Sequence, residues 1–388
     1  MNDRIYLDHN ATTPLDPEVR EAMRPFLSER FGNPSSIYQE GMDARYGVEK
    51  ARMQVAELLG CEEEEVIFTG GGSESDNAAI FGTLRALRER GRHIITSQIE
   101  HPAVLRTCQY LEKYEGYKVD YLPVDRDGRV GVEDVAAALR PDTALVTIML
   151  ANNETGAIQP IRELCARAHE QGVRFHTDAV QAAGKVPLSV GELGVELLSL
   201  SAHKFHGPKG MGVLYCKRGT ELFPLIFGGG QERGLRAGTE NVAGIVGTGH
   251  AAMLARRRLA EDAARLGELR DLLENQLLQR VPGARVLAGG AHRLPNTSLM
   301  TFANVPGVEL VAEIDGLGVC ASSGSACSAG TTKVSHVLSA MGVSRAEGLS
   351  AVRFSLGRDN TRQEIERAAA VVAECVERMR LEARPSGR

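Results

Sequence analysis

Residues 143–180 read "TALVTIMLANNETGAIQPIRELCARAHEQGVRFHTDAV". A mostly apolar run at 143–150 comes first and predicts a buried strand. A helical pattern follows at 161–172, because apolar side chains recur there with i, i+3, i+4, i+7 spacing and Gly172 ends the series. A second apolar run at 173–180 predicts another strand. This order is typical of two parallel strands joined by a crossover helix.

The same alternation extends over residues 60–220, which predicts an α/β fold with a mainly parallel central sheet and flanking helices. After residue 250 the character changes to a long helix rich in Ala, Leu and Arg at 251–281, followed by shorter mixed segments. We therefore expect a second, smaller α+β domain. The other apolar runs of the predicted sheet are "EVIFT" (65–69), "HIITSQ" (93–98), "LLSLSAHK" (197–204) and "GVLYCK" (212–217).

The composition narrows the class of protein. Of the 388 residues, 43% are hydrophobic and 24% are charged, and the net charge is -5. This charge gives no electrostatic reason to expect nucleic acid or an anionic membrane as a partner, so the expected substrates are small molecules. No apolar run has membrane-spanning length and the N-terminus lacks a signal-peptide pattern, so we expect a cytoplasmic protein. The seven cysteines are odd in number and form no C-x-x-C pair, which argues against a disulfide framework or a zinc knuckle.

A glycine-rich turn, "FTGGGSESDN" (68–77), joins a predicted strand to a predicted helix. Glycines let the backbone approach an anion, and a helix N-terminus offers free N–H groups and the positive end of its dipole, so the turn suits a phosphate group. The spacing of Ser73 and Asp76 also resembles a capping box, and a tight turn with an ordinary serine cap explains the stretch equally well. The turn matches neither a Walker loop nor G-x-G-x-x-G.

Asp178 and Lys204 each follow a predicted strand. A helix N-cap is the alternative role of Asp178, and His203, taken alone, is more often a core or capping residue. Loops that leave the carboxyl ends of strands meet at one edge of an open α/β sheet, so these residues can meet the glycine-rich turn. A phosphate cradle, a buried carboxylate and a lysine together suggest pyridoxal phosphate, with the lysine as Schiff-base partner and the carboxylate on the ring nitrogen.

Ten motifs, in order along nearly the whole chain, resemble those of cysteine desulfurases of the NifS and IscS type, which have a class V aminotransferase fold. The resemblance implies fold type I, with a large pyridoxal-phosphate-binding domain at 15–255 and a small domain at 1–14 and 256–388 that carries a catalytic cysteine loop. The motifs are "YLDHNATTPLDPEV" (6–19), "FGNPSS" (31–36), "SESDN" (73–77), "EHPAV" (100–104), "NNETGAIQP" (152–160), "HTDAVQAAGK" (176–185), "SAHKFHGPKG" (201–210), "GGGQERGLRAGTENV" (228–242), "SSGSACSAG" (322–330) and "VRFSLGR" (352–358).

The resemblance also implies a role for each site residue. Lys204 is implied as the Schiff-base lysine and Cys327 as the nucleophile, and His101 as the side chain stacked on the cofactor ring. Arg353 is implied to bind the substrate carboxylate, a task that suits a planar guanidinium. The remaining implied contacts are Asp178 with the ring nitrogen, Gln181 and Asn153 with the ring hydroxyl side or the substrate carboxylate, Gly72, Ser73, Ser201 and His203 with the phosphate, and Thr239 with the phosphate from a second subunit.

The implied activity is conversion of L-cysteine to L-alanine, with the sulfur held as a persulfide on Cys327 and passed to an acceptor such as an iron–sulfur scaffold protein. A homodimer is implied, and no metal is expected. Tyr38 and the stretch after Cys327 depart from the commoner pattern, and Cys320 has the alternatives of a sulfur relay or a buried packing residue. A selenocysteine lyase or another class V enzyme would share Lys204, Asp178 and His101. A different class, a metal-binding scaffold, would use His203, His206, His101 and Cys327, although H-x-x-H here spans a Gly-Pro turn.

Overall fold

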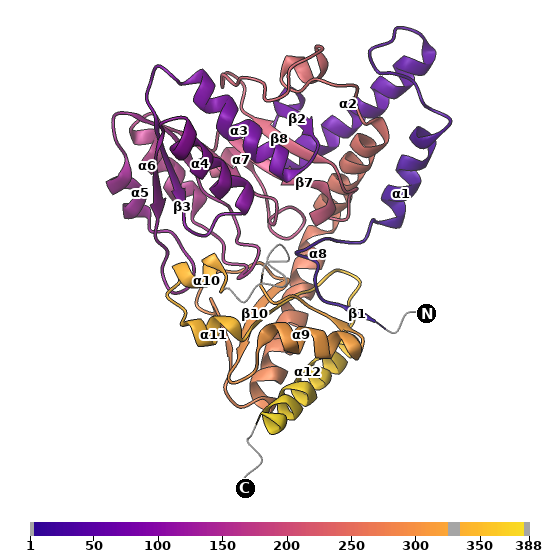
Figure 1. Cartoon of the computed structure of the whole chain (residues 1–388). Coiled ribbons are helices and arrows are strands. Elements are labelled where there is room, and N and C mark those ends of the chain that lie inside the picture. Colours follow the sequence, from indigo (N-terminus) through magenta and orange to yellow (C-terminus); the bar gives the residue numbers. More distant parts are fainter. Residues whose placement is uncertain (1–3, 325–333, 384–388) are drawn as a thin grey trace.

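The computed structural model describes residues 4–324 and 334–383. A seven-stranded sheet lies at its centre, in the order β2-β8-β7-β6-β5-β3-β4 (Figure 1). Strand β8 runs antiparallel to both of its neighbours and all the other pairs are parallel, which confirms the predicted mainly parallel sheet. The strands are β2 (Val66–Thr69), β3 (His93–Ser97), β4 (Lys118–Leu122), β5 (Thr143–Thr147), β6 (Arg174–Asp178), β7 (Leu197–Ser201) and β8 (Gly212–Cys216).

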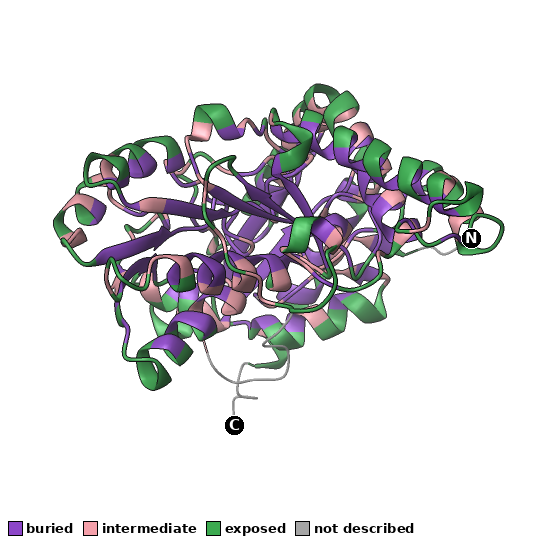
Figure 2. Cartoon of the chain, turned by 90° about the horizontal axis from the view of Figure 1, so that it is seen from above, coloured by how far each residue is buried: buried purple, intermediate pink, exposed green. Residues whose placement is uncertain are grey.

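Helices cover both faces of this sheet, so its inner strands are buried and read as nearly continuous apolar runs in the sequence (Figure 2). The crossover helix predicted from the opening stretch is α6 (Ile161–Glu170), and its four periodic apolar residues are all buried. The other helices of this part of the chain are α1 (Pro17–Met23), α2 (Gln39–Leu59), α3 (Gly72–Ala86), α4 (Pro102–Tyr114), α5 (Val132–Ala138) and α7 (Val190–Leu193).

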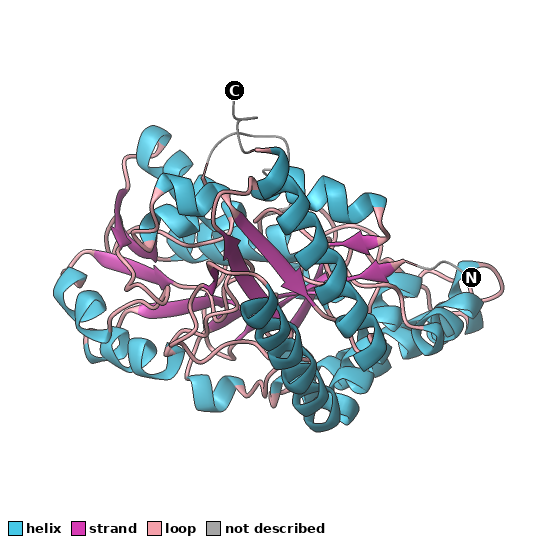
Figure 3. Cartoon of the chain, turned by 90° about the horizontal axis from the view of Figure 1, so that it is seen from below, coloured by secondary structure: helices cyan, strands magenta, loops and turns pink. Residues whose placement is uncertain are grey.

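A smaller unit with its own apolar core lies beside the sheet, at the bottom of Figure 1 and nearest the viewer in Figure 3. Its sheet has the antiparallel order β12-β10-β9, and β1 pairs in parallel with β11. Ile5 and Leu7, from the start of the chain, belong to this core. The elements are β1 (Ile5–Tyr6), β9 (Ala284–Val286), β10 (Thr297–Phe302), α9 (Gly307–Gly316), β11 (Val319–Cys320), α10 (His336–Ala340), α11 (Arg345–Leu349), β12 (Ala351–Ser355) and α12 (Arg362–Glu382).

One long helix, α8 (Val242–Arg280), connects the two units. Leu254 near its beginning is buried in the core of the large sheet, whereas Leu273 near its end is buried in the core of the smaller unit. The domain boundary expected at residue 255 falls inside α8, and no break in the helix marks it. The boundary therefore stays a prediction. In the part of the chain that the structure describes, no helix is long and apolar enough to cross a membrane.

Candidate active site

A cavity of about 350 Å³ lies at the carboxyl ends of the parallel strands. The loops that follow β2, β3, β5, β6 and β7 all reach it, as the parallel topology predicts. Arg353 reaches the same cavity from β12 of the smaller unit, so side chains of both units meet there. The sequence-predicted residues that line it are Gly72, Ser73, His101, Asn153, Asp178, Gln181, Ser201, His203, Lys204 and Arg353.

Lys204 ends a single 3₁₀ turn, Ala202–Lys204, that follows β7 directly. Its Nζ donates hydrogen bonds to the main-chain oxygens of Asn10 at 2.6 Å and Ala11 at 2.7 Å. Both acceptors belong to the segment that follows β1, far away in the sequence. The N-terminal segment therefore holds the lysine amine at the cavity.

Asp178 is the last residue of β6 and is buried. Its Oδ1 accepts a hydrogen bond from the Val180 amide at 2.9 Å, in a turn and not at the start of a helix, so the N-cap alternative does not hold. Burial raises the pKa of the Asp178 carboxyl, and the nearby His101 ring acts in the opposite direction. A cationic partner in the cavity would stabilise the ionised form.

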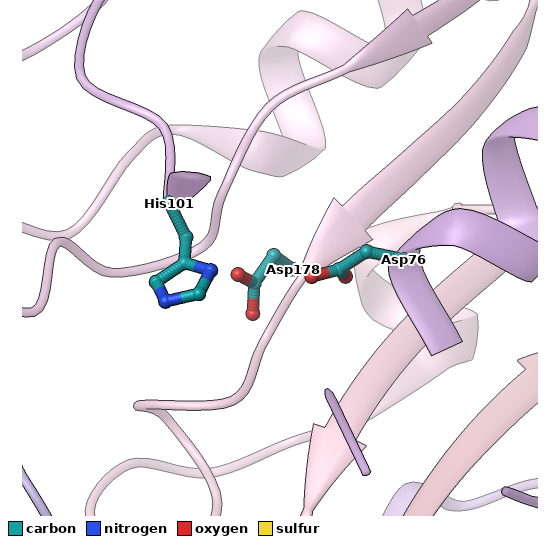
Figure 4. Close-up of side chains that lie close together, drawn as sticks. All are labelled: Asp76, His101 and Asp178. Carbon is teal, nitrogen blue, oxygen red and sulfur yellow. The ribbon is translucent and has the colours of Figure 1, made fainter. Parts of the chain in front are cut away.

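His101 is the N-cap of α4, a role that the sequence did not indicate. Its Nδ1 accepts a hydrogen bond from the Ala103 amide at 3.1 Å, which places the proton of the neutral ring on Nε2. Burial lowers the pKa of His101, which favours the neutral form of the ring. One nitrogen of His101 and one oxygen each of Asp76 and Asp178 lie within 4.8 Å of one another (Figure 4).

The serine cap, which was the alternative explanation for the spacing of Ser73 and Asp76, does not form. The N-cap of α3 is Gly71, which has no side chain to accept a bond, and Asp76 is a buried part of the cavity wall at 1% exposure. Its Oδ1 has no hydrogen-bond partner in the described part of the chain and lies 3.8 Å from His176 Nε2. Burial, together with the charge of Asp178, raises the pKa of Asp76 well above its ordinary value.

The start of α3 forms a cradle for an anion. Gly71 has φ 148° and ψ 173°, a conformation that is essentially restricted to glycine. A Cβ on Gly72 would approach Val180 Cγ2 to 2.8 Å, so a side chain does not fit there without a shift. The first N–H groups of any helix have no acceptor within the helix, which leaves those of α3 for a ligand. The buried Ser201 and the half-buried His203 lie at the same cavity. Burial, and then the charge of Lys204, lowers the pKa of His203 to about 4, so this ring is neutral at pH 7.

Arg353 is 1% exposed and fixed at two of its nitrogens. Nη1 donates to the main-chain oxygen of Asn153 at 2.9 Å, and Nη2 donates to Asp8 Oδ1 at 2.6 Å. Among the described residues no atom pairs with its Nε. A buried guanidinium with an unused donor beside a cavity suits a ligand carboxylate.

One predicted residue, Thr239, does not line the cavity. Thr239 lines a neighbouring pocket of about 250 Å³ that shares only Gly70 and Gly210 with the cavity. Cys327 lies outside the described residues. Cys320 is half-buried in β11, and Arg4 Nη2 donates to its Sγ at 3.1 Å.

Of the histidines in the alternative metal-binding set, His203 and His206 do not come together with His101 among the described residues. Within the described ranges, the group of possible ligands that comes together consists of Asp76, His101 and Asp178. His203 instead pairs through Nδ1 with Thr12 Oγ1, and His206 Nδ1 bonds the main-chain oxygen of Pro14.

Asn10 is a site residue that sequence reasoning missed. Its amide group donates to the main-chain oxygen of Asn153 and to Thr297 Oγ1, and its main-chain oxygen accepts from Gln181 Nε2 and Lys204 Nζ. Because these partners lie 143 to 287 residues away, no local pattern signals the contacts. Glu154, buried at the cavity with its Oε1 bonded by Ser335 Oγ, was missed for the same reason.

A family model described as aminotransferase class-V matches residues 5–368. This chain belongs to that family. The cysteine desulfurase IscS of Dictyoglomus turgidum is 48% identical to it over 380 residues, which are 98% of this chain and 96% of the relative. The protein of the same name from Methanosarcina thermophila is 48% identical over 98% of this chain and 93% of its own length.

Solved structures of class V relatives are similar to the whole chain. A NifS-like protein matches with a TM-score of 0.91 and 41% identity, covering 96% of this chain and 99% of that one. An apo cysteine desulfurase from Thermococcus onnurineus NA1 matches with a TM-score of 0.86 and 25% identity, covering 97% and 95%. These likenesses confirm the fold type I architecture expected from the sequence.

Proposed function

We propose that this chain is a cysteine desulfurase that binds pyridoxal 5'-phosphate, converts L-cysteine to L-alanine and transfers the sulfur to Cys327. The observation that carries the proposal is the meeting of the Lys204 amine, the Asp178 carboxylate and the glycine-rich start of α3 around one cavity. Relatives named cysteine desulfurase, 48% identical over nearly the whole chain, support it.

The polar groups of the cavity fit the cofactor. The N–H groups in the first turn of α3 suit a phosphate, the Asp178 carboxylate suits a protonated ring nitrogen, and the Lys204 amine suits an aldehyde. A volume of about 350 Å³ is in the range of small-molecule sites. When bound, pyridoxal phosphate supplies an electron sink for the charge that develops as a proton leaves the substrate Cα.

Side chains of the protein would transfer the proton, bind the substrate and hold the cofactor ring. Lys204 would accept the Cα proton, and the carbonyl oxygens of Asn10 and Ala11 would hold its amine at the cavity. Arg353 would bind the substrate carboxylate through its unused Nε–H. The neutral ring of His101, fixed by the Ala103 amide, would stack on the cofactor.

Sulfur transfer requires a thiolate, which we assign to Cys327. The substrate C–S bond breaks and an S–S bond forms, while the proton of the Cys327 thiol takes the place of the sulfur on the substrate Cβ. L-cysteine and a thiol therefore give L-alanine and a persulfide, with every atom accounted for. A selenocysteine lyase would share Lys204, Asp178 and His101, and no feature of the described residues favours it.

We further propose that the protein is a homodimer in which Thr239 contributes to the phosphate site of the partner. The separation of Thr239 from the cavity of its own chain supports this arrangement. Apolar side chains before and within α2 are also unusually exposed, including Phe31 at 77%, Ile37 at 88% and Tyr46 at 69%. Exposed apolar side chains of this kind suit a surface that a second subunit covers.

The persulfide would then pass to an acceptor protein, for which an iron–sulfur scaffold is the candidate. Cytoplasmic location stays a prediction from the sequence.

The test combines activity with covalent mapping. The purified chain, incubated with L-cysteine and a thiol reductant, should release sulfide and alanine in equal amounts. Borohydride should bleach the bound cofactor and attach it to the peptide that contains Lys204. Lys204→Ala should abolish both results, whereas Lys217→Ala, at a lysine whose side chain is 50% exposed, should change neither. Full activity in Lys204→Ala would end the assignment.

A further inference from the structure

Lys185 is a buried lysine that the proposed mechanism does not use. It lies in the turn after β6 and is 7% exposed. Its Nζ donates to two amide oxygens, Gln181 Oε1 at 2.8 Å and Asn10 Oδ1 at 3.3 Å. Within residues 4–324 and 334–383, no carboxylate forms an ion pair with it. A buried ammonium group normally has such a partner, so this amine needs a different explanation.

The number of acceptors indicates the state of this amine. A charged ammonium group has three N–H donors, whereas a neutral amine has two, and Lys185 has two acceptors. Burial lowers the pKa of Lys185 well below its ordinary value, and the charges of Lys204 and Arg353 act in the same direction. A neutral amine therefore satisfies this site fully, and an ammonium would leave one donor unpaired.

The two acceptors connect Lys185 to the candidate active site. Gln181 lines the cavity, and its Nε2 donates at 3.0 Å to the main-chain oxygen of Asn10. The same oxygen accepts from Lys204 Nζ. An amide side chain has two orientations that differ by a half-turn, and the donor at Lys185 selects the one with Oε1 toward Lys185 and Nε2 toward Asn10.

We propose that Lys185 is a positioning residue that holds the amide of Gln181 in the orientation that the bound cofactor requires. The proposal rests on the proposed function, because the group that Gln181 would contact is pyridoxal phosphate. The plainer alternative is that Lys185 only fills space and satisfies two amide oxygens, which would make it important for stability and not for the cofactor.

A double-mutant cycle separates these alternatives. Lys185→Met keeps the length of the side chain and removes its donors, and it is made both in the parent and in Gln181→Ala. The dissociation constant of pyridoxal phosphate is measured by titrating each apo protein. In the parent background, Lys185→Met should weaken binding about tenfold, because the bound cofactor excludes the water that could otherwise satisfy Gln181 Oε1. In the Gln181→Ala background the same change should weaken binding less than about twofold.

The stability of the apo proteins is the second measurement. Lys185→Met removes the desolvation cost of the amine and takes a donor from Gln181 Oε1, which water in the empty cavity can satisfy, so the urea midpoint of the apo protein should change little. Lys113→Met, at an exposed lysine near the end of α4, is the control and should change neither quantity.

Three outcomes overturn the proposal: equal weakening in both backgrounds, unchanged cofactor affinity in Lys185→Met, or a variant that fails to fold or whose apo protein is less stable. The cofactor measurements contain no L-cysteine, so they remain decisive if the parent binds pyridoxal phosphate but forms no alanine. That last result would remove the desulfurase assignment alone. If the parent does not bind the cofactor, both proposals fail.

Discussion

Gly71, at the start of α3, allows the most direct test of the anion cradle. Its φ of 148° and ψ of 173° lie in a region that is essentially restricted to glycine. A Cβ built on Gly71 would meet nothing within 4 Å, so Gly71→Ala adds no steric clash. In the protein without cofactor, the substitution therefore tests mainly the backbone conformation of the cradle.

The expected cost follows from this conformation. A non-glycine residue held in such a region costs about 1–3 kcal/mol, and the reduced freedom of the unfolded chain returns about 0.4–1 kcal/mol. If the apo loop keeps its shape, the loss appears in the free energy of unfolding. If the loop relaxes in the apo protein, the cost instead weakens cofactor binding, because the phosphate must restore the strained shape. Taking the middle of each range, about 2 and about 0.7 kcal/mol, the two losses together should come to roughly 1.3 kcal/mol in either case.

Urea unfolding of the apo protein measures the loss of unfolding free energy, and titration with pyridoxal phosphate measures the loss of cofactor affinity. Gly267→Ala is the matched control, because Gly267 lies inside α8 and its added Cβ also meets nothing within 4 Å. A helix interior prefers alanine, so this control should gain about 0.5–1 kcal/mol of unfolding free energy and leave cofactor affinity unchanged. A summed effect of Gly71→Ala that matches the control in sign and size would refute the reasoning.

Three further predictions concern buried and reactive groups. Burial raises the pKa of Glu100 from 4.5 to about 8, so the folded protein binds more protons than the unfolded chain between these values. The free energy of unfolding should therefore fall as pH rises through this window, by up to about 1.4 kcal/mol per pH unit. The urea midpoint of Glu100→Gln should depend less steeply on pH there than that of the parent, and equal slopes for the two proteins would contradict the prediction. Asp178→Asn should bind pyridoxal phosphate at least about tenfold more weakly, because the amide cannot neutralise a protonated ring nitrogen, and unchanged affinity would argue against the assigned contact. Cys327→Ala should still bind the cofactor but form no protein persulfide, whereas Cys320→Ala should keep most of the activity; mass mapping of the persulfide to Cys320 would reverse the two roles.

The sheet and its crossover helices are predictable from the sequence because their signals are local. Apolar runs separated by helical patterns identify strands that are buried on both faces, as β5, α6 and β6 confirm. The rule that strand ends gather at one edge then brings Asp178 and Lys204 to the same cavity. Both steps use only the order and spacing of residues along the chain.

The capping box at Ser73 shows where a local pattern misleads. The spacing is right, but Gly71 begins the helix and Asp76 turns inward to a buried position beside Asp178. Which of several nearby residues becomes the N-cap depends on how the turn packs against the sheet. That packing is a tertiary property.

The contacts of the N-terminal segment were decided only by the tertiary structure. Asn10 and Asp8 follow a two-residue strand of the smaller unit, yet they bond to Lys204 and Arg353 at the cavity. Nothing in the eight or so residues around Asn10 indicates a lysine 194 positions away or an amide network with Lys185. The sequence by itself determines which segments form strands and helices and which residue types follow them, since those preferences act over a few residues. The partners of each polar side chain depend on how two separate cores pack against each other, and only the folded chain specifies that.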